Sequence, residues 1–136
     1  MRAPHIRVLL GEPADSPAEL VVLPGGSPGG QGRTVVIPAP AWRPPDGPER
    51  ALAQAYRRAV AEADARGARS MAIPAVLARS PWPLDVVTRV ALTVLTSTPS
   101  SLLEVHVMAS TPAMVERWAE ALIREPDQRR PPGGRW

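Results

Sequence analysis

Residues that could carry out chemistry are few and scattered in this chain. It has no cysteine, which excludes thiolate nucleophiles, disulfides and cysteine-based zinc sites. His5 and His106 each fall within an expected strand, and neither belongs to a recognisable serine–histidine–acid arrangement. No H-x-x-x-H or D-x-D cluster offers the spacing of metal ligands. The sequence therefore predicts no catalytic residue, no metal site and no cofactor.

One glycine-rich segment has two interpretations. Residues 25–32 read GGSPGGQG, and a loop of this type can cradle a phosphate with its backbone N–H groups. The alternative is a surface connection, because no helix N-terminus follows the segment and it contains no lysine.

The composition is that of a packed globular protein. With 136 residues, 44% hydrophobic and 21% charged, the chain has the size of a single domain. It lacks the run of about 18 apolar residues that spans a membrane. The apolar run near the N-terminus is too short for a secretory signal, so a cytoplasmic location is expected. A net charge of +3 and 4% aromatic residues speak against nucleic-acid binding, which uses a basic face with stacking aromatics.

Hydrophobic patterning predicts five strands and three helices. The strands are expected at 5–10, 19–23, 34–37, 69–76 and 102–108, where apolar residues alternate or form short runs bounded by turn residues. Helices are expected between Pro48 and Gly67, from about Pro83 to Ser97, and from the cap at Thr111, followed by Pro112, to about residue 124. The inward face expected for the first helix is Leu52, Tyr56, Ala59, Val60 and Ala63, and that for the third is Val115, Trp118, Ala119 and Leu122.

This order of elements indicates an α/β fold. Helices that alternate with strands predict a three-layer α/β/α sandwich with a mixed, mostly parallel sheet. We expect one domain over residues 1–125 and an Arg/Pro/Gly-rich flexible tail over 126–136. Ligands of such sheets bind beyond the carboxyl ends of the strands. The loops expected there are 24–32, 38–47, 77–83 and 109–111, the last of which contains Ser110.

The middle of the chain resembles the macro domain family. A helix containing Tyr56 leads to the strand SMAIPAV at 70–76, then to Trp82–Pro83 and an alanine-containing helix. GEPA at 11–14 lies where the family has G-D-I-T. The resemblance implies a mixed sheet between helices that binds ADP-ribose over the strand ends. Some family members also hydrolyse ADP-ribosyl bonds.

The resemblance also implies a set of ligand-binding residues. Glu12 would replace the aspartate that meets the adenine amino group, although the residues themselves favour a strand-end surface carboxylate. Gly25 and Gly26 would lie beside the distal ribose and the diphosphate. In the second diphosphate loop, Arg79 would supply charge or remain solvated, and Trp82 would stack on the ligand or plug the cleft. The full set of expected ligand-binding residues is Glu12, Gly25, Gly26, Arg79, Ser80, Trp82 and Ser110.

Three departures from the family pattern weaken the implied site. Gly26 stands where the family has its catalytic-type asparagine, and the chain has no asparagine. The loop 77–82 lacks glycine, and Pro81 lacks an N–H group. Only residues 25–33 join the second and third strands, where family members insert a helix that walls the cleft.

We therefore expect a non-catalytic, weak binder of ADP-ribose or a related nucleotide at the strand-end rim. A protein-interaction or self-assembling module with a vestigial cleft is the alternative, with a protein or a second copy as its partner. An ADP-ribosyl hydrolase is the second alternative.

Overall fold

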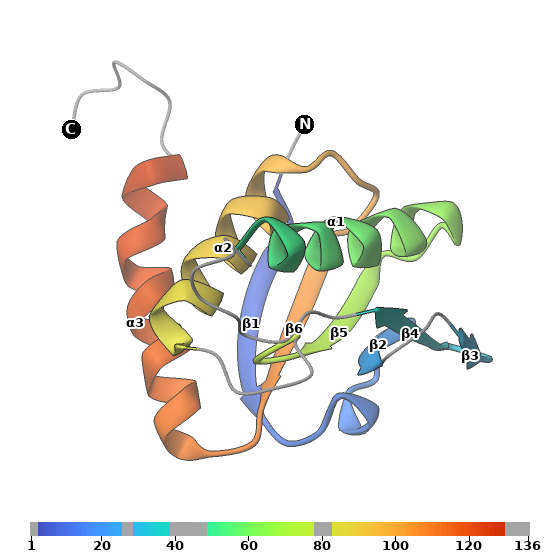
Figure 1. Ribbon diagram of the computed structural model, residues 1–136, viewed down its shortest axis with the longest axis horizontal. Coiled ribbons are helices and arrows are strands. Elements are labelled where there is room, and N and C mark those ends of the chain that lie inside the picture. The colour runs from blue at the N-terminus through green and yellow to red at the C-terminus, as the bar shows by residue number, and fades with distance from the viewer. Residues whose placement is uncertain (1–2, 26–28, 39–48, 78–82, 130–136) are drawn as a thin grey trace.

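The computed structural model describes residues 3–25, 29–38, 49–77 and 83–129. In this part of the chain the elements follow the expected order, with a short strand and a 3-10 turn added (Figure 1). They are β1 (His5–Leu10), η1 (Pro13–Asp15), β2 (Leu20–Gly25), β3 (Gly29–Gln31), β4 (Thr34–Pro38), α1 (Glu49–Ala65), β5 (Ser70–Pro74), α2 (Leu84–Ser97), β6 (Glu104–Ala109) and α3 (Pro112–Arg129).

One mixed sheet organises the fold. Its strand order is β1-β6-β5-β2-β4-β3. All neighbouring pairs from β1 to β4 are parallel, and only β3 runs antiparallel to its neighbour, β4. The carboxyl ends of β1, β6, β5, β2 and β4 consequently meet at one edge. This confirms the predicted α/β class with a mixed, mostly parallel sheet.

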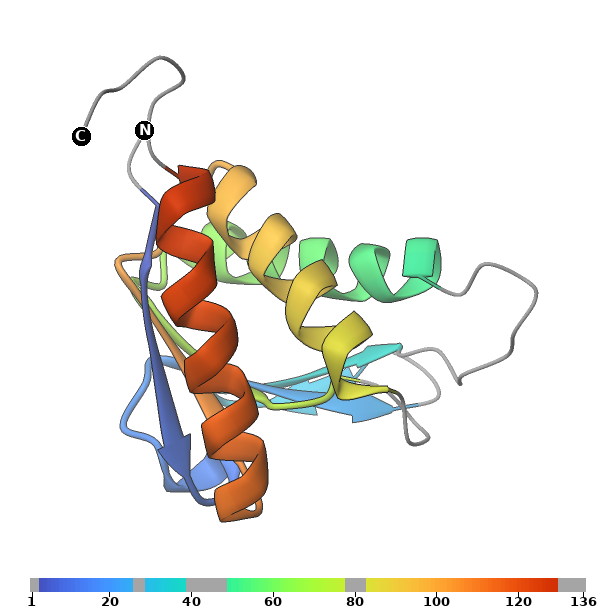
Figure 2. The ribbon, with the colours of Figure 1, turned by 90° about the vertical axis from the view of Figure 1, so that its left-hand side faces the viewer.

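The three helices lie on one face of the sheet (Figure 2). α1 packs against α2, α2 packs against α3, and α3 contacts β1 and β6. Right-handed crossovers place α1 and α2 on this face, because they carry the chain from β4 to β5 and from β5 to β6, toward the β1 edge. The link from β1 to β2 runs the other way and therefore crosses the opposite face. Among the described residues, the layer on the second face is thin. It consists of this link, residues 11–19, which contain η1 and which we call the strap.

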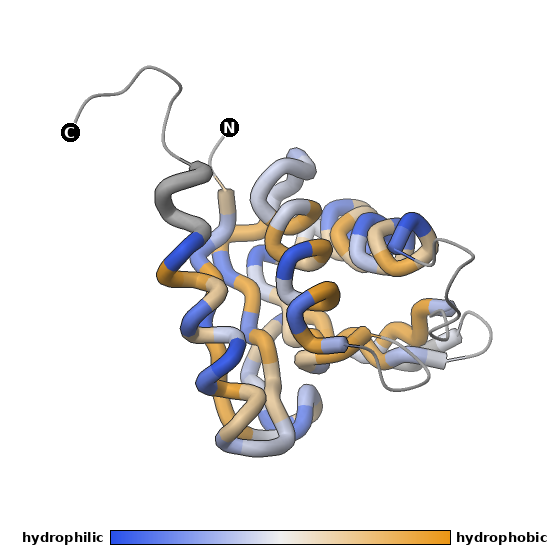
Figure 3. The backbone as a smooth tube through the Cα atoms, turned by 60° about the vertical axis from the view of Figure 1, so that its left-hand side comes forward, coloured by the Kyte–Doolittle hydropathy of each residue, from blue (hydrophilic) through white to orange (hydrophobic). Residues whose placement is uncertain are grey.

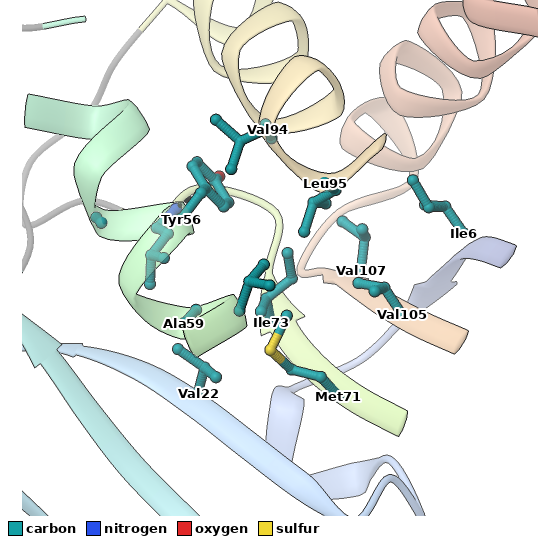
Figure 4. Packing of buried hydrophobic residues seen from close by; sticks show 14 of the residues in the cluster. Ile6, Val22, Tyr56, Ala59, Met71, Ile73, Val94, Leu95, Val105 and Val107 are labelled. Carbon is teal, nitrogen blue, oxygen red and sulfur yellow. Dashed lines mark hydrogen bonds between the residues drawn. The ribbon is translucent and has the colours of Figure 1, made fainter. Parts of the chain in front are cut away.

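Alternation along the strands divides the buried residues between the two faces. Val22, Ile73 and Val107 point toward the helices and join the main core, together with Tyr56 of α1 (Figure 4). Their strand neighbours on the second face, Val21, Ala72 and Met108, form a separate small cluster with Ala18 of the strap. Hydrophobic and hydrophilic residues alternate along the helices, while the central strands are largely hydrophobic (Figure 3), as buried parallel strands require.

The predicted inward face of α1 is confirmed. Its residues, namely Leu52, Tyr56, Ala59, Val60 and Ala63, are all buried. Gly67, at φ +67°, follows the last turn of α1 as expected, because glycine adopts this conformation without steric cost. α3 continues to Arg129, past the expected start of the tail at 126. Residues 130–136 lie outside the described part.

The expected loop at 25–32 is wrong in part. Gly29–Gln31 form β3, which pairs with β4 through backbone hydrogen bonds. Glycine is a poor strand former. Because the pairing is made by the backbone and not by side chains, no pattern of residue types predicts β3 from the sequence. No helix within the described ranges is both long and apolar enough to cross a membrane.

Candidate functional site

A small pocket lies at the edge where the parallel strands end. It has a volume of about 170 Å³ and spans the ends of β1, β5 and β6 and the first turn of α3. It is lined by Gly11, Glu12, Pro13, Pro74, Ala75, Val76, Met108, Ser110 and Met114.

Backbone hydrogen bonds continue the sheet past the strand ends and bring these segments together. The Gly11 N–H donates to the Ala109 oxygen at 2.8 Å, and the Ala75 N–H donates to the Met108 oxygen at 2.9 Å. The floor of the pocket is therefore an extension of the sheet, and its position is fixed by strand pairing.

The strap forms one wall, starting at Gly11. This residue has φ +142°, and a Cβ placed on it would lie 3.1 Å from the Asp15 Oδ2 and 3.4 Å from the Met108 Cε. Asp15 accepts the Glu12 N–H at 2.9 Å, and its own N–H donates to the Glu12 carbonyl at 2.9 Å. These two bonds hold the start of η1, with the exposed Glu12 side chain at the rim.

The first turn of α3 forms the opposite wall. The Thr111 side-chain oxygen accepts the Met114 N–H at 3.2 Å, so Thr111 caps the helix as the sequence predicts. Ser110 precedes the cap and donates its hydroxyl to the Met114 sulfur at 3.4 Å.

Two buried aromatic residues fix the chain that leaves β5. The Trp118 indole N–H donates to the Ala75 carbonyl at 3.1 Å. The Leu77 N–H donates to the Tyr56 phenolic oxygen at 3.3 Å, and burial raises the pKa of that phenol. α1 and α3 thus hold the entry to the expected second diphosphate loop. Both residues fall on the inward faces expected for their helices, but no sequence motif indicates this role.

The expected ligand-binding residues divide into three groups. Glu12 and Ser110 lie in the pocket. Gly25 ends β2 at the same edge of the sheet but is not part of the pocket lining. Gly26, Arg79, Ser80 and Trp82 lie outside the described residues.

His106 does belong to a serine–histidine–acid arrangement, so the contrary expectation was wrong. Its Nδ1 lies 2.7 Å from the Ser16 Oγ, and its Nε2 bonds to Glu104. Ser16 is 90 positions away in sequence, so only the fold brings the three together. Ser16 is 2% exposed, and its Oγ accepts the Ala18 N–H at 3.1 Å. A substrate has no access to this hydroxyl, and the trio is a buried polar network beneath the strap.

A larger groove of about 540 Å³ lies between α2 and α3, away from the strand ends. Leu92 and Ala121 are its buried apolar residues. Two of its arginines are engaged by acidic partners, Arg89 by Glu49 and Arg117 by Asp85. Exposed ion pairs of this kind contribute little to stability. Among the described residues, no group of three or more histidine or acidic side chains could hold a metal ion.

Comparisons with known proteins support the fold. No protein-family model matches the chain, and no curated protein matches its sequence. Solved structures do match, 36 chains in all. One is a mutant macrodomain of Oceanobacillus iheyensis with ADPR, similar at a TM-score of 0.69 and 14% identity over 88% of this chain and 92% of that chain. The chain therefore has a macrodomain-like fold.

Proposed function

We propose that the chain is a non-catalytic macro-like domain that binds ADP-ribose, or a related nucleotide, weakly at the carboxyl ends of its strands. The observation that carries the proposal is the pocket lined by Glu12 and Ser110. It lies at the edge where ligands of open parallel sheets bind. A solved macrodomain of similar fold contains ADPR, which supports this choice of ligand.

The chemistry of the pocket suits one part of a nucleotide. The Glu12 carboxylate can accept hydrogen bonds from an exocyclic amine or a hydroxyl, and the Ser110 hydroxyl can donate or accept. The apolar surface of Pro74, Val76 and Met114 can pack against a ring. Because drug-sized ligands occupy about 300–1,000 Å³, a pocket of about 170 Å³ leaves much of a dinucleotide-sized ligand in water. Weak affinity follows from this limited burial.

Titration calorimetry with ADP-ribose tests the proposal. We expect a dissociation constant of high micromolar to millimolar size and a stoichiometry of one. Glu12→Gln keeps the size of the side chain but removes its charge, and it should weaken binding by about five- to tenfold, as should Ser110→Ala. Glu120→Gln, in the α2–α3 groove, is the matched control and should bind like the wild type. Absence of heat at millimolar ligand, or loss of binding only in the control, would refute this site.

The proposed lack of catalytic activity requires a separate measurement. Incubation with an ADP-ribosylated peptide should release ADP-ribose no faster than the uncatalysed control. Faster release by the wild type, abolished in Glu12→Gln, would replace the proposal with a hydrolase.

An interaction module is the second candidate, and the second face of the sheet favours it. Leu9 and Leu23 there are only partly buried around the small cluster beneath the strap, and a partner protein or a second copy could cover them. Light scattering distinguishes the two. A dimer that dissociates in Leu23→Ser, combined with no response to ADP-ribose, would favour assembly over ligand binding.

A further inference from the structure

Polar contacts from two sides fasten the strap to the sheet. Beneath it, the hydroxyl of Ser16 meets the Nδ1 of His106 at 2.7 Å. At its side, the guanidinium of Arg33, in the turn before β4, donates to the carbonyl oxygens of Ala14, Ser16 and Ala18 at 2.8 to 3.0 Å. His106 and Arg33 therefore both hold Ser16, one by its hydroxyl and the other by its carbonyl.

The proton positions in the buried network follow from its acidic end. The hydrogen bond from His106 lowers the pKa of Glu104, with attraction by Arg7 and His5 adding to the effect. An ionised carboxylate accepts hydrogen bonds only, so the His106 Nε2 carries the hydrogen between them. In the neutral imidazole the Nδ1 is then an acceptor, and the Ser16 O–H donates to it. With the Ala18 N–H on the Ser16 oxygen, the hydroxyl both donates and accepts a hydrogen bond.

We propose that His106 is a proton-operated latch for the strap: the neutral imidazole holds Ser16, and the protonated imidazole releases it. Protonation places a hydrogen on the Nδ1, which then faces the hydroxyl as a second donor. Ser16 can accept from it only by turning its own hydrogen away, at a position that is 2% exposed. A buried donor without an acceptor is costly, whereas a displaced strap lets water satisfy it.

Charged groups lie on several elements around the imidazole. Glu104, on β6, accepts the hydrogen bond of the His106 Nε2. Arg7, on neighbouring β1, lies 4.0 Å from the Glu104 carboxylate and offsets part of its charge. His5, also on β1, acts on the same carboxylate. Arg33 places a further positive charge on the strap side. On β5, the residue paired with His106 is the uncharged Ala72.

The strap connects the His106–Ser16 contact to the pocket. Ser16 directly follows η1, and Glu12 lies at the other end of that turn, in the pocket wall. Release of Ser16 should therefore displace Glu12. This effect on binding rests on the proposed function, but the latch itself does not.

Hydrogen exchange of the Ala18 amide tests the latch without any ligand. Imidazoles change charge between about pH 5 and 8, so NMR exchange is measured on the full chain across that range. Expressed as a protection factor, the rate is free of its intrinsic pH dependence. We expect protection of Ala18 to fall by about tenfold from the upper to the lower end of that range. Unchanged protection across that range would overturn the proposal.

Variants assign the effect to one ring. The chain has two histidines, so His5→Asn leaves His106 alone and should keep the pH dependence. In His106→Asn the amide oxygen can still accept from Ser16 but does not titrate, so protection should stay high and level. If Ala18 protection depended on pH equally in His106→Asn and in the wild type, the proposed role of His106 would be wrong. If that variant does not fold, the dependence of Ala18 protection on pH in the wild type and in His5→Asn still tests the proposal.

A calorimetric comparison at pH 5.5 and 8 tests the link to the pocket. Weaker ADP-ribose binding at the lower pH, absent in His106→Asn, supports it. If ADP-ribose binds at neither pH, the proposed function fails and the exchange result stands on its own.

Discussion

The indole N–H of Trp118, in α3, donates a 3.1 Å hydrogen bond to the carbonyl oxygen of Ala75, just past the end of β5. Trp118 is completely buried. One side chain thus fills the space between helix and sheet and fixes the strand end that forms the floor of the candidate pocket. Stability and site geometry are linked at this contact.

Trp118→Phe should destabilise the fold by about 2–4 kcal/mol, because it leaves a small cavity and an unpaired buried carbonyl oxygen. Urea unfolding measures the loss. Ile123→Ala is the control on the same helix, since Ile123 is 75% exposed, and it should change stability by no more than about 0.5 kcal/mol. Equal unfolding midpoints for Trp118→Phe and the wild type would contradict the assigned role.

Gly11→Ala should cost about 1–3 kcal/mol, since a non-glycine residue is strained at φ +142° and the new Cβ would press on Asp15. Asp15 holds the Glu12 N–H, so the pocket wall should shift as well. Thermal unfolding provides the measurement. Gly29→Ala is the matched control, because a Cβ there meets nothing within 4 Å. The prediction fails if both variants unfold at the same temperature.

The positions of the main elements could be predicted from the sequence because their signals are local. Apolar alternation located β1, and helical spacing with Gly67 located α1. The strand-end rule predicted that the loop containing Ser110 lies at the carboxyl edge of the sheet, because the carboxyl ends of parallel strands must share one edge. Glu12 was expected there only from the resemblance to the macro domain family, and the structure has both residues in the pocket lining.

Features made by distant partners could not be predicted in this way. Ser16 and His106 are 90 positions apart and meet only because the β1–β2 link crosses the second face of the sheet. The three guanidinium contacts of Arg33 likewise follow from the path of the strap. Neither arrangement has a sequence periodicity or a motif.

Arg33→Met should destabilise the chain by about 1–3 kcal/mol, because three strap carbonyls lose their shared donor while the side-chain volume is roughly kept. Arg33→Lys retains the charge but not the planar fork of donors, so an intermediate loss is expected. Thermal unfolding of both variants measures the order. Arg50→Met, an exposed change on α1, is the control and should be nearly neutral. Full recovery by lysine would show that charge alone holds the strap.

Glu104 should make stability depend on pH in acid. The hydrogen bond from His106, then the charges of His106, Arg7 and His5, lower its pKa in the folded state. A lowered folded pKa means that the stabilisation is fully present above the ordinary value of 4.5 and is lost as the pH falls through the lower folded value. The difference in unfolding free energy between wild type and Glu104→Gln should therefore shrink from pH 6 to pH 2 in urea titrations. His106→Asn removes the main cause, so the same comparison in that background should vary less with pH. A difference that stays constant from pH 6 to pH 2 in the wild-type background would show that the Glu104–His106 bond does not contribute to folding stability.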